Sequence, residues 1–270
     1  MKQIVRRVAI LRSLFKRAIA LREGVLLLFP SAWLIQIAGF LRPQSVRLLG
    51  RNFSIVPENY REALDLIDTI VALDQYRAAR LLTAESVVID AGANIGAFSV
   101  FAGALTPHGS VYAFEPGPRA FQLLKQNIAS YPNIRCYNVG LGDMSKRRKL
   151  YSHSQDTFST TYEDSGRVEI VRSKGAVIEV DSPIMTIDEF VAQQNIDRVD
   201  FIKIDTEGYE AKVIQGARDT IKKQRPIIVM AGYHHSHDAT ALPSLVDAIV
   251  ENYRCSIEDR GDVTLFCAPC

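Results

Sequence analysis

The segment from Val87 to Gly96 constrains the fold of this chain more than any other part of the sequence. An apolar run ends in an acid, Asp90, and a turn of small residues then leads directly into a helical pattern. This order predicts a strand, a tight turn and the N-terminus of a helix. Backbone N–H groups converge at such a turn, and a ligand can approach its glycines closely because they carry no Cβ. The acid favours a ligand with a positive charge or free hydroxyls over a bare phosphate.

The spacing within the turn separates the candidate ligands. A dinucleotide-binding fold has G-x-G-x-x-G after the strand, whereas here Gly92 and Gly96 lie four residues apart with Asn94 between them. The G-K-[ST] of a P-loop is absent from the sequence. The pattern D-x-G-x-N-x-G resembles the first motif of S-adenosylmethionine (SAM) dependent methyltransferases. An ordinary strand-to-helix turn is the alternative until the surrounding sequence is considered.

A second acid follows the strand predicted over 110–114. Glu115 stands at its end, Pro116 stops the strand, and a helical pattern runs from Pro118 to Ala129. In nucleotide-binding α/β folds, a carboxylate at this position accepts two hydrogen bonds from a ribose diol. The sequence therefore predicts that Glu115 holds a ribose.

Two more acids come after later strands. Asp143 follows the strand predicted over 134–138 and is placed either to accept from an exocyclic adenine amine or to cap its own turn. Asp205 ends the strand predicted over 199–204. Ligands of open α/β sheets bind beyond the carboxyl ends of the strands. Four acids in this position therefore predict one site: Asp90, Glu115, Asp143 and Asp205.

With these segments the chain resembles the FkbM-type methyltransferases over residues 75–268. The resemblance rests on 90–96, 114–116 and 199–210, with Gly216, and on Tyr233, His234 and Asp238. It implies a class I SAM-dependent methyltransferase, usually one that acts on oxygen. Many relatives carry a glutamate before the histidine that follows the fifth strand, whereas this chain reads Met230-Ala231-Gly232-Tyr233-His234 there.

The last third of the chain fits such a fold. Strands are predicted over 226–230 and 253–257 with a helix over 242–251 between them, and the turn 259–262 leads into a final strand. So short a turn requires an antiparallel pair. We expect the α/β, Rossmann-like fold of class I SAM-dependent methyltransferases, with a seven-stranded, mostly parallel sheet whose last strand is antiparallel, and an N-terminal helical extension.

Bound SAM assigns a role to each strand-end residue. Asp90 would take the methionine ammonium or fix the loop around it, the glycines would let the backbone approach, Glu115 would hold the ribose and Asp143 the adenine amine. The predicted cofactor-binding residues are Asp90, Gly92, Asn94, Gly96, Glu115, Pro116, Asp143 and Asp205.

His234 is the predicted general base, because an unperturbed histidine accepts a proton near neutrality; a structural hydrogen bond is the alternative role. Asp205 and Glu207 complete the predicted catalytic residues by positioning the acceptor. We predict no metal, because no fixed ligand spacing is matched. The clustered side chains that would permit one are Asp205, Glu207, His234, His235, His237 and Asp238.

Positive charge is concentrated at the N-terminus. The net charge is +2, but residues 1–22 hold seven basic residues and no acid, so the remainder carries about −5. This balance gives no case for nucleic-acid binding. Ile4, Val8 and Phe15 share one helical face opposite the basic residues, and an apolar run follows over 25–41. A basic amphipathic helix is typical of a segment that lies in a membrane face, and a cap packed on the domain is the alternative.

These patterns divide the chain into an extension, 1–56, and a SAM-dependent methyltransferase domain, 57–270. We expect a cytoplasmic protein, peripheral on the cytoplasmic face of the membrane through residues 1–41. A helix is predicted over 57–82.

Residues 144–184 form a less regular insertion, with short strands predicted at 149–151, 168–171 and 176–180. Its polar part, 152–166, is either a substrate lid or a plain surface loop. The four cysteines predict no disulfide framework, and the single C-x-x-C at Cys267–Cys270 is weak evidence for zinc. A reduced chain is expected.

The predicted function is SAM-dependent methyl transfer, most simply to a hydroxyl of a sugar, a glycan or glycolipid, or another small molecule. One alternative is a membrane-tethered, non-catalytic SAM-binding or scaffold protein. Another is a nicotinamide-dependent oxidoreductase, which the missing G-x-G-x-x-G disfavours. The expected partner is a small-molecule or glycan acceptor, and the sequence leaves its identity and the oligomeric state open.

Overall fold

A computed structural model describes residues 45–55, 60–153, 160–173, 175–259 and 262–270. The chain falls into two compact units, which divide between Arg77 and Ala78. The amphipathic helix and apolar run predicted before residue 42 lie outside the described residues, so the membrane contact and the domain boundary at residue 57 stay predictions. Among the helices that the structure describes, none is both long and apolar enough to cross a bilayer.

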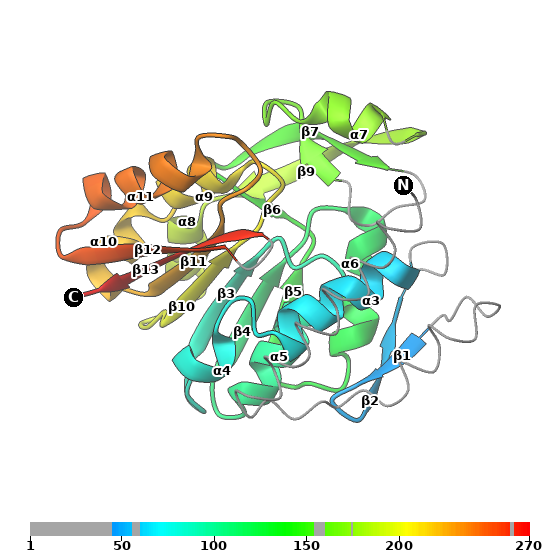
Figure 1. The fold of residues 1–270 in the computed structure, drawn as a ribbon, viewed down its shortest axis with the longest axis horizontal. Coiled ribbons are helices and arrows are strands. Elements are labelled where there is room, and N and C mark those ends of the chain that lie inside the picture. The colour runs from blue at the N-terminus through cyan, green and yellow to red at the C-terminus, as the bar shows by residue number, and fades with distance from the viewer. Residues whose placement is uncertain (1–44, 56–59, 154–159, 174, 260–261) are drawn as a thin grey trace. The chain divides into compact units, whose positions relative to one another are not determined.

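The larger unit is built around a seven-stranded sheet with the order β12-β13-β11-β10-β3-β4-β5 (Figure 1). Six of the strands point the same way, and β13 runs antiparallel to both of its neighbours. The strands are β3 (Val87–Ala91), β4 (Ser110–Phe114), β5 (Ile134–Tyr137), β10 (Phe201–Ile204), β11 (Ile227–Ala231), β12 (Tyr253–Asp259) and β13 (Val263–Pro269). The predicted fold class is confirmed. The central position of β3 brings the carboxyl ends of β4 and β10 to either side of its own.

Helices cover both faces of this sheet (Figure 1), as apolar strands buried on both faces require. On one face lie α4 (Ala78–Leu81), α5 (Ala97–Leu105) and α6 (Pro118–Ile128). On the other lie α8 (Ile187–Gln193), α9 (Glu210–Gln215), α10 (Arg218–Gln224) and α11 (Asp238–Ile249). Helix α11 begins at Asp238, four residues before its predicted start at Leu242. At the observed start, the Asp238 carboxylate accepts from the N–H of His235 at 2.6 Å.

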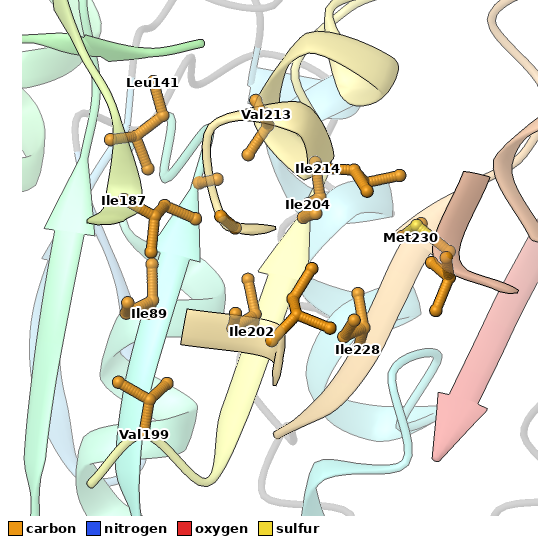
Figure 2. Packing of buried hydrophobic residues seen from close by; sticks show 14 of the residues in the cluster. Ile89, Leu141, Ile187, Val199, Ile202, Ile204, Val213, Ile214, Ile228 and Met230 are labelled. Carbon is orange, nitrogen blue, oxygen red and sulfur yellow. The ribbon is translucent and has the colours of Figure 1, made fainter. Parts of the chain in front are cut away.

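The main core lies between the sheet and the second group of helices. Ile89, Ile202 and Ile228 from three neighbouring strands are fully buried and pack with Ile187 and Val213 from the helices (Figure 2). Burial of each such side chain contributes about 1.5–3 kcal/mol. The core therefore fixes the strand ends from which the polar residues emerge.

A second sheet of four strands, with the order β6-β9-β7-β8, is inserted between β5 and β10. Its elements are β6 (Gly140–Leu141), β7 (Lys146–His153), β8 (Thr160–Tyr162), α7 (Val168–Ser173) and β9 (Val177–Met185). The strands predicted at 149–151 and 176–180 are confirmed. The strand predicted at 168–171 is wrong: α7 occupies it, and Arg172 pairs with Glu169 one helical turn away. Residues 154–159 lie outside the described residues, so the lid stays a prediction.

The smaller unit contains a hairpin and a short helical segment. Strands β1 (Ser45–Leu48) and β2 (Arg51–Ser54) pair across Leu49 and Gly50, both with positive φ, which is the geometry that two-residue hairpin turns prefer. The single helix predicted over 57–82 is wrong. Helix α3 (Tyr60–Ile67) continues as a π-helical turn, η2 (Asp68–Ala72). The chain then leaves the helix because Asp74 and Arg77 adopt left-handed backbone.

The prediction of a fully reduced chain is also wrong. Cys255 and Cys267 form a disulfide, whereas Cys136 and Cys270 are free thiols. The register of β12 against β13 places the two bonded cysteines directly opposite each other. That register depends on how the two strands pair, which the spacing of cysteines does not reveal.

Candidate cofactor loop and acidic cluster

The turn between β3 and α5 is held against the end of β4. The N–H groups of Gly92 and Ala93 both donate to the carbonyl of Phe114, at 3.0 and 2.9 Å. Asn94 and Gly96 have positive φ, of 50° and 93°, and Gly96 caps α5. A turn with this backbone aims N–H groups beyond the strand ends, which is the arrangement expected from the sequence.

The two glycines make room for the chain itself. A Cβ at Gly92 would lie 1.8 Å from the carbonyl oxygen of Asp205, and one at Gly96 would lie 2.8 Å from Leu124. Both glycines therefore have a packing role within the protein, and close approach of a ligand to them stays a prediction. Gly92 lets the loop after β10 close onto the turn, and Gly96 lets α6 pack against it.

Asp90 is buried and engaged within the protein. It pairs with Lys203 on the neighbouring strand at 3.1 Å and accepts from the hydroxyl of Ser99 at 2.6 Å. Lys203, equally buried, also donates to the carbonyl of Gly92 at 2.6 Å. Of the two roles expected for Asp90, fixing the loop agrees with this geometry. Direct binding of an ammonium does not, because the carboxylate has no exposed surface.

Glu115 lies where the ribose carboxylate was expected. Its carboxylate accepts from the N–H of Asn94 at 2.8 Å and from the N–H of Gly117 at 2.7 Å. Burial raises the pKa of Glu115 to about 7, against the opposing effects of these two hydrogen bonds and of the Lys203 charge. Each carboxylate oxygen keeps further accepting capacity. The carbonyl of the adjacent Pro116 accepts from the side chain of Asn138 at 3.2 Å.

Asp143 follows a strand of a different sheet from the other three acids, and its role at the adenine stays a prediction. It follows β6, a strand of the second sheet, and forms an ion pair with Lys146 at 3.3 Å. The expectation that four acids end strands of one sheet is therefore wrong for this residue. The sequence Asn138–Asp143 leaves the central sheet after β5, so the turn role left open for Asp143 agrees better with its position.

A second cluster gathers after β10 and β11. The Nε2 atom of His234 lies 3.7 Å from Asp205 and 3.6 Å from Glu207, and its Nδ1 lies 2.9 Å from Glu210. His234 and Glu210 are buried, whereas the Glu207 side chain is 37% exposed. The structure thus brings together the three predicted catalytic residues and adds Glu210.

The pKa values in this cluster differ from the ordinary ones. Burial alone would lower the pKa of His234, but the hydrogen bond that its ring donates to Glu210 and the surrounding carboxylates raise it to about 9. Burial raises the pKa of Glu207, while burial of Glu210 is overcome by His234, which lowers the pKa of that carboxyl. A pKa of about 9 favours the charged imidazolium near neutrality over a histidine with an ordinary pKa, and the role of His234 as the general base stays a prediction.

Two further side chains tie this cluster together. Arg167, from the segment between β8 and α7, donates to the carbonyl of His234 at 2.8 Å and pairs with Glu207 at 3.1 Å. Tyr233 is 40% exposed, and its hydroxyl lies 3.4 Å from Asp205. The insertion is thereby joined to the acidic cluster through charged contacts.

The donor groups of Asp205, Glu210 and His234 lie within 4.8 Å of one another and are of kinds that bind divalent cations. However, one oxygen of Glu210 already receives two backbone N–H groups and the histidine ring. This oxygen of Glu210 is therefore engaged within the protein, and the absence of a metal from the cluster stays a prediction. His235 and His237 stack on each other, and His235 faces the carbonyl of Gly208.

Sequence reasoning assigned no site role to several residues of these two regions: Ser99, Arg167, Lys203, Glu210 and Tyr233. Lys203 and Glu210 belong to the K-I-D-T-E-G-Y-E segment. A lysine within a predicted buried strand is unusual unless it is paired, so Lys203 could have been predicted to pair with an acid. Arg167 had no such signal, because the insertion carries no recognisable pattern.

The comparison with protein families agrees with this arrangement. The family model described as a methyltransferase FkbM domain matches residues 90–257, which is more than half of the chain. The chain therefore belongs to the FkbM methyltransferase family. The match includes both the cofactor loop and the acidic cluster.

Two curated relatives are of particular interest. The chain is 26% identical over 228 residues to the AMB antimetabolite synthetase AmbE of Pseudomonas aeruginosa, covering 74% of this chain and 10% of that protein. It is 25% identical over 148 residues to the 2-O-methyltransferase NoeI of Sinorhizobium fredii, covering 52% of this chain and 61% of that protein. The chain thus spans less than two thirds of either relative.

A solved structure shows the same fold. The crystal structure of methyltransferase FkbM from Methylobacillus flagellatus is 20% identical, with a TM-score of 0.52, over 78% of this chain and 54% of that one. At this identity the likeness concerns the fold alone.

Proposed function

We propose that this protein is a SAM-dependent O-methyltransferase that acts on a hydroxyl of a sugar, a glycan or glycolipid, or another small molecule. The observation that carries the proposal is the arrangement of Glu115 and of Asp205, Glu207 and His234 at the carboxyl edge of one parallel sheet, which is where open α/β sheets bind ligands. The relative named as a 2-O-methyltransferase supports oxygen as the acceptor atom.

The residues of the cofactor loop fit SAM. The oxygens of Glu115 that accept one backbone N–H each can also accept from the two ribose hydroxyls. Asp90, held by Lys203, fixes the turn in which Gly92, Asn94 and Gly96 lie, and Pro116 fixes the end of β4. Asp205 lies between the turn and His234 and would face the cofactor and the acceptor together.

Bound SAM supplies an electrophilic methyl group. The protein then has to align an acceptor oxygen behind that carbon and to bind the proton that the hydroxyl loses. Asp205 and Glu207 provide two carboxylates for that task, each within 4 Å of the His234 ring.

Calorimetric titration of SAM and, separately, NADH into the full chain tests the cofactor. We expect micromolar SAM binding, about −8 kcal/mol, and no NADH binding. Glu115→Ala should weaken SAM binding, whereas Glu251→Ala, which removes an exposed carboxylate, should not. NADH binding would instead favour an oxidoreductase, and folded protein that binds neither ligand would favour a scaffold role.

An acceptor screen follows. Transfer of a labelled methyl group from SAM to a panel of methyl glycosides and polyols would identify the acceptor class. SAM binding without transfer to any hydroxyl, nitrogen or lipid-linked acceptor would favour the non-catalytic SAM-binding alternative. Transfer to amines alone would contradict oxygen as the acceptor atom.

We also propose a peripheral membrane contact on the cytoplasmic face through residues 1–41, supported by the seven basic residues within positions 1–22 and the apolar face opposite them. Flotation with anionic vesicles, with and without residues 1–42, tests it. Equal behaviour of both forms would contradict the contact.

A further inference from the structure

The histidine of the acidic cluster is held from one side by a carboxylate that can only accept hydrogen bonds. A single oxygen of Glu210 receives the N–H of Thr206 at 2.8 Å, the N–H of Gly208 at 3.3 Å and the Thr206 hydroxyl at 3.2 Å. The same oxygen lies 2.9 Å from Nδ1 of His234. Because this oxygen is surrounded by donors, Glu210 is ionised and Nδ1 carries a hydrogen.

The other ring nitrogen faces two more carboxylates. Nε2 lies 3.7 Å from Asp205 and 3.6 Å from Glu207, which is close enough for charge attraction but too long for good hydrogen bonds. A hydroxyl oxygen placed between them would accept from Nε2–H and donate to a carboxylate. The backbone of this loop is adapted to the arrangement, because Glu207 and Gly208 both have positive φ.

The other groups around His234 offset the negative charge of these carboxylates only in part. Arg167 pairs with Glu207 and donates to the His234 carbonyl. The Tyr233 ring lies tilted against the imidazole, with ring centroids 4.5 Å apart, and His235 faces Gly208. Three carboxylates therefore surround His234, against one guanidinium. The positive charge of the ring is favoured, in agreement with its pKa of about 9.

We propose, resting on the function above, that Glu210 is a positioning residue that keeps His234 as an imidazolium donor to the acceptor oxygen, and that Glu207 is the base. As the acceptor oxygen bonds to the methyl carbon, the carbon–sulfur bond breaks and its electron pair stays on sulfur. The hydroxyl proton passes to the Glu207 carboxylate and then to solvent. His234 keeps both ring protons and stabilises the negative charge on oxygen. Asp205, which Tyr233 already contacts, positions the hydroxyl.

Imidazole nitrogen NMR on the full chain tests the charge state without cofactor or acceptor. The His234 signals, assigned with His234→Gln, should show both nitrogens protonated at pH 7.5 and a midpoint near 9. Glu210→Gln should lower that midpoint by about one unit or more, because the main compensating charge is lost. The exposed neighbour substitution His237→Gln should leave it unchanged.

A neutral His234 at pH 7.5 in the wild type would overturn the proposal. So would a Glu210→Gln variant that still binds SAM and whose His234 titrates with an unchanged midpoint. Loss of one ring proton on adding millimolar Mg²⁺ would also overturn it, because the cluster would then be a cation site. SAM calorimetry on the same samples separates the outcomes: failure to bind SAM contradicts the proposed function, while the NMR result decides the charge state independently.

The base is tested by methyl transfer to the same panel of methyl glycosides. Glu207→Gln should slow transfer by about 10²-fold or more with SAM affinity kept, and Asp205→Asn should slow transfer at saturating SAM less. A larger loss in Asp205→Asn would overturn the choice of Glu207. In His234→Gln, methyl transfer should still depend on a base, and its pH profile below pH 8 should be unchanged. A variant whose rate no longer falls as the pH is lowered would return the base role to His234.

Discussion

The cofactor loop and the acidic cluster lie on adjacent strand ends but use their charged residues differently. In the loop, Asp90 and Lys203 are buried together, and their contacts end within the protein. In the cluster, the Nε2 atom of His234 stands 3.6 Å or more from two partly exposed carboxylates. A buried, fully paired charge stabilises one backbone arrangement, whereas charges left slightly apart can bind something placed between them.

The largest effect is expected from breaking the buried pair of the loop. Lys203→Met should lower the free energy of unfolding by about 3–5 kcal/mol, because it leaves Asp90 charged, buried and without its cation. The double variant Asp90→Asn/Lys203→Met should recover much of this loss. Urea unfolding measures both.

The control for this pair is an exposed one. Lys223 and Asp219, with side chains 73% and 65% exposed, also form an ion pair, and Lys223→Met should change stability by less than about 1 kcal/mol. A comparably small effect at Lys203 would show that the loop does not depend on its buried pair.

The second effect sharpens the role of the turn. Gly92→Ala should destabilise the protein by about 1–3 kcal/mol through backbone strain, and further because the new Cβ would strike the Asp205 carbonyl. SAM affinity should fall as well. Gly50→Ala is the matched control, because Gly50 has the same φ of 78° but open space around its Cβ position. If urea unfolding showed equal losses of stability in Gly92→Ala and Gly50→Ala, backbone strain alone would explain both.

The third effect concerns Glu115, the acid of the loop that we propose binds the ribose of SAM. Glu115 accepts hydrogen bonds from ribose hydroxyls best when ionised, and burial raises its pKa to about 7. SAM affinity should therefore rise with pH through 7 and be about tenfold weaker at pH 6 than at pH 8. Calorimetry should show this slope in the wild type, and Glu115→Gln should bind weakly with little pH dependence. An identical slope in the variant would assign the titration to another group.

The smallest effect is expected at the edge of the cluster. Tyr233→Phe removes a long hydrogen bond to Asp205 but keeps the ring against His234. Stability should change by less than about 1 kcal/mol, and SAM affinity by less than about fivefold. Thermal unfolding and calorimetry measure these values. A tenfold loss of SAM affinity would mean that Tyr233 positions Asp205, and that the side chains of the cluster depend on one another as those of the loop do.

The sequence determined the order of strands and helices in the catalytic unit. Continuous apolar runs such as Val87–Ile89 and Phe201–Ile204 predict strands buried on both faces, and the short turn before Val263 predicts the antiparallel end of the sheet. These are local signals, because periodicity and turn chemistry act over a few residues. For the same reason Asp90, Glu115 and Asp205 could be placed at strand ends.

Only the tertiary structure decided which neighbours these residues have. The pairing of β3 with β10 brings Lys203 beside Asp90, and the loops after β10 and β11 bring Glu210 to His234. The route of the chain after β5 places Asp143 after a strand of the second sheet, and strand register joins Cys255 to Cys267. Such contacts join residues up to 113 positions apart, as in the pair of Lys203 with Asp90 across the sheet. A histidine's charge depends on its neighbours, so its sequence position could not reveal it.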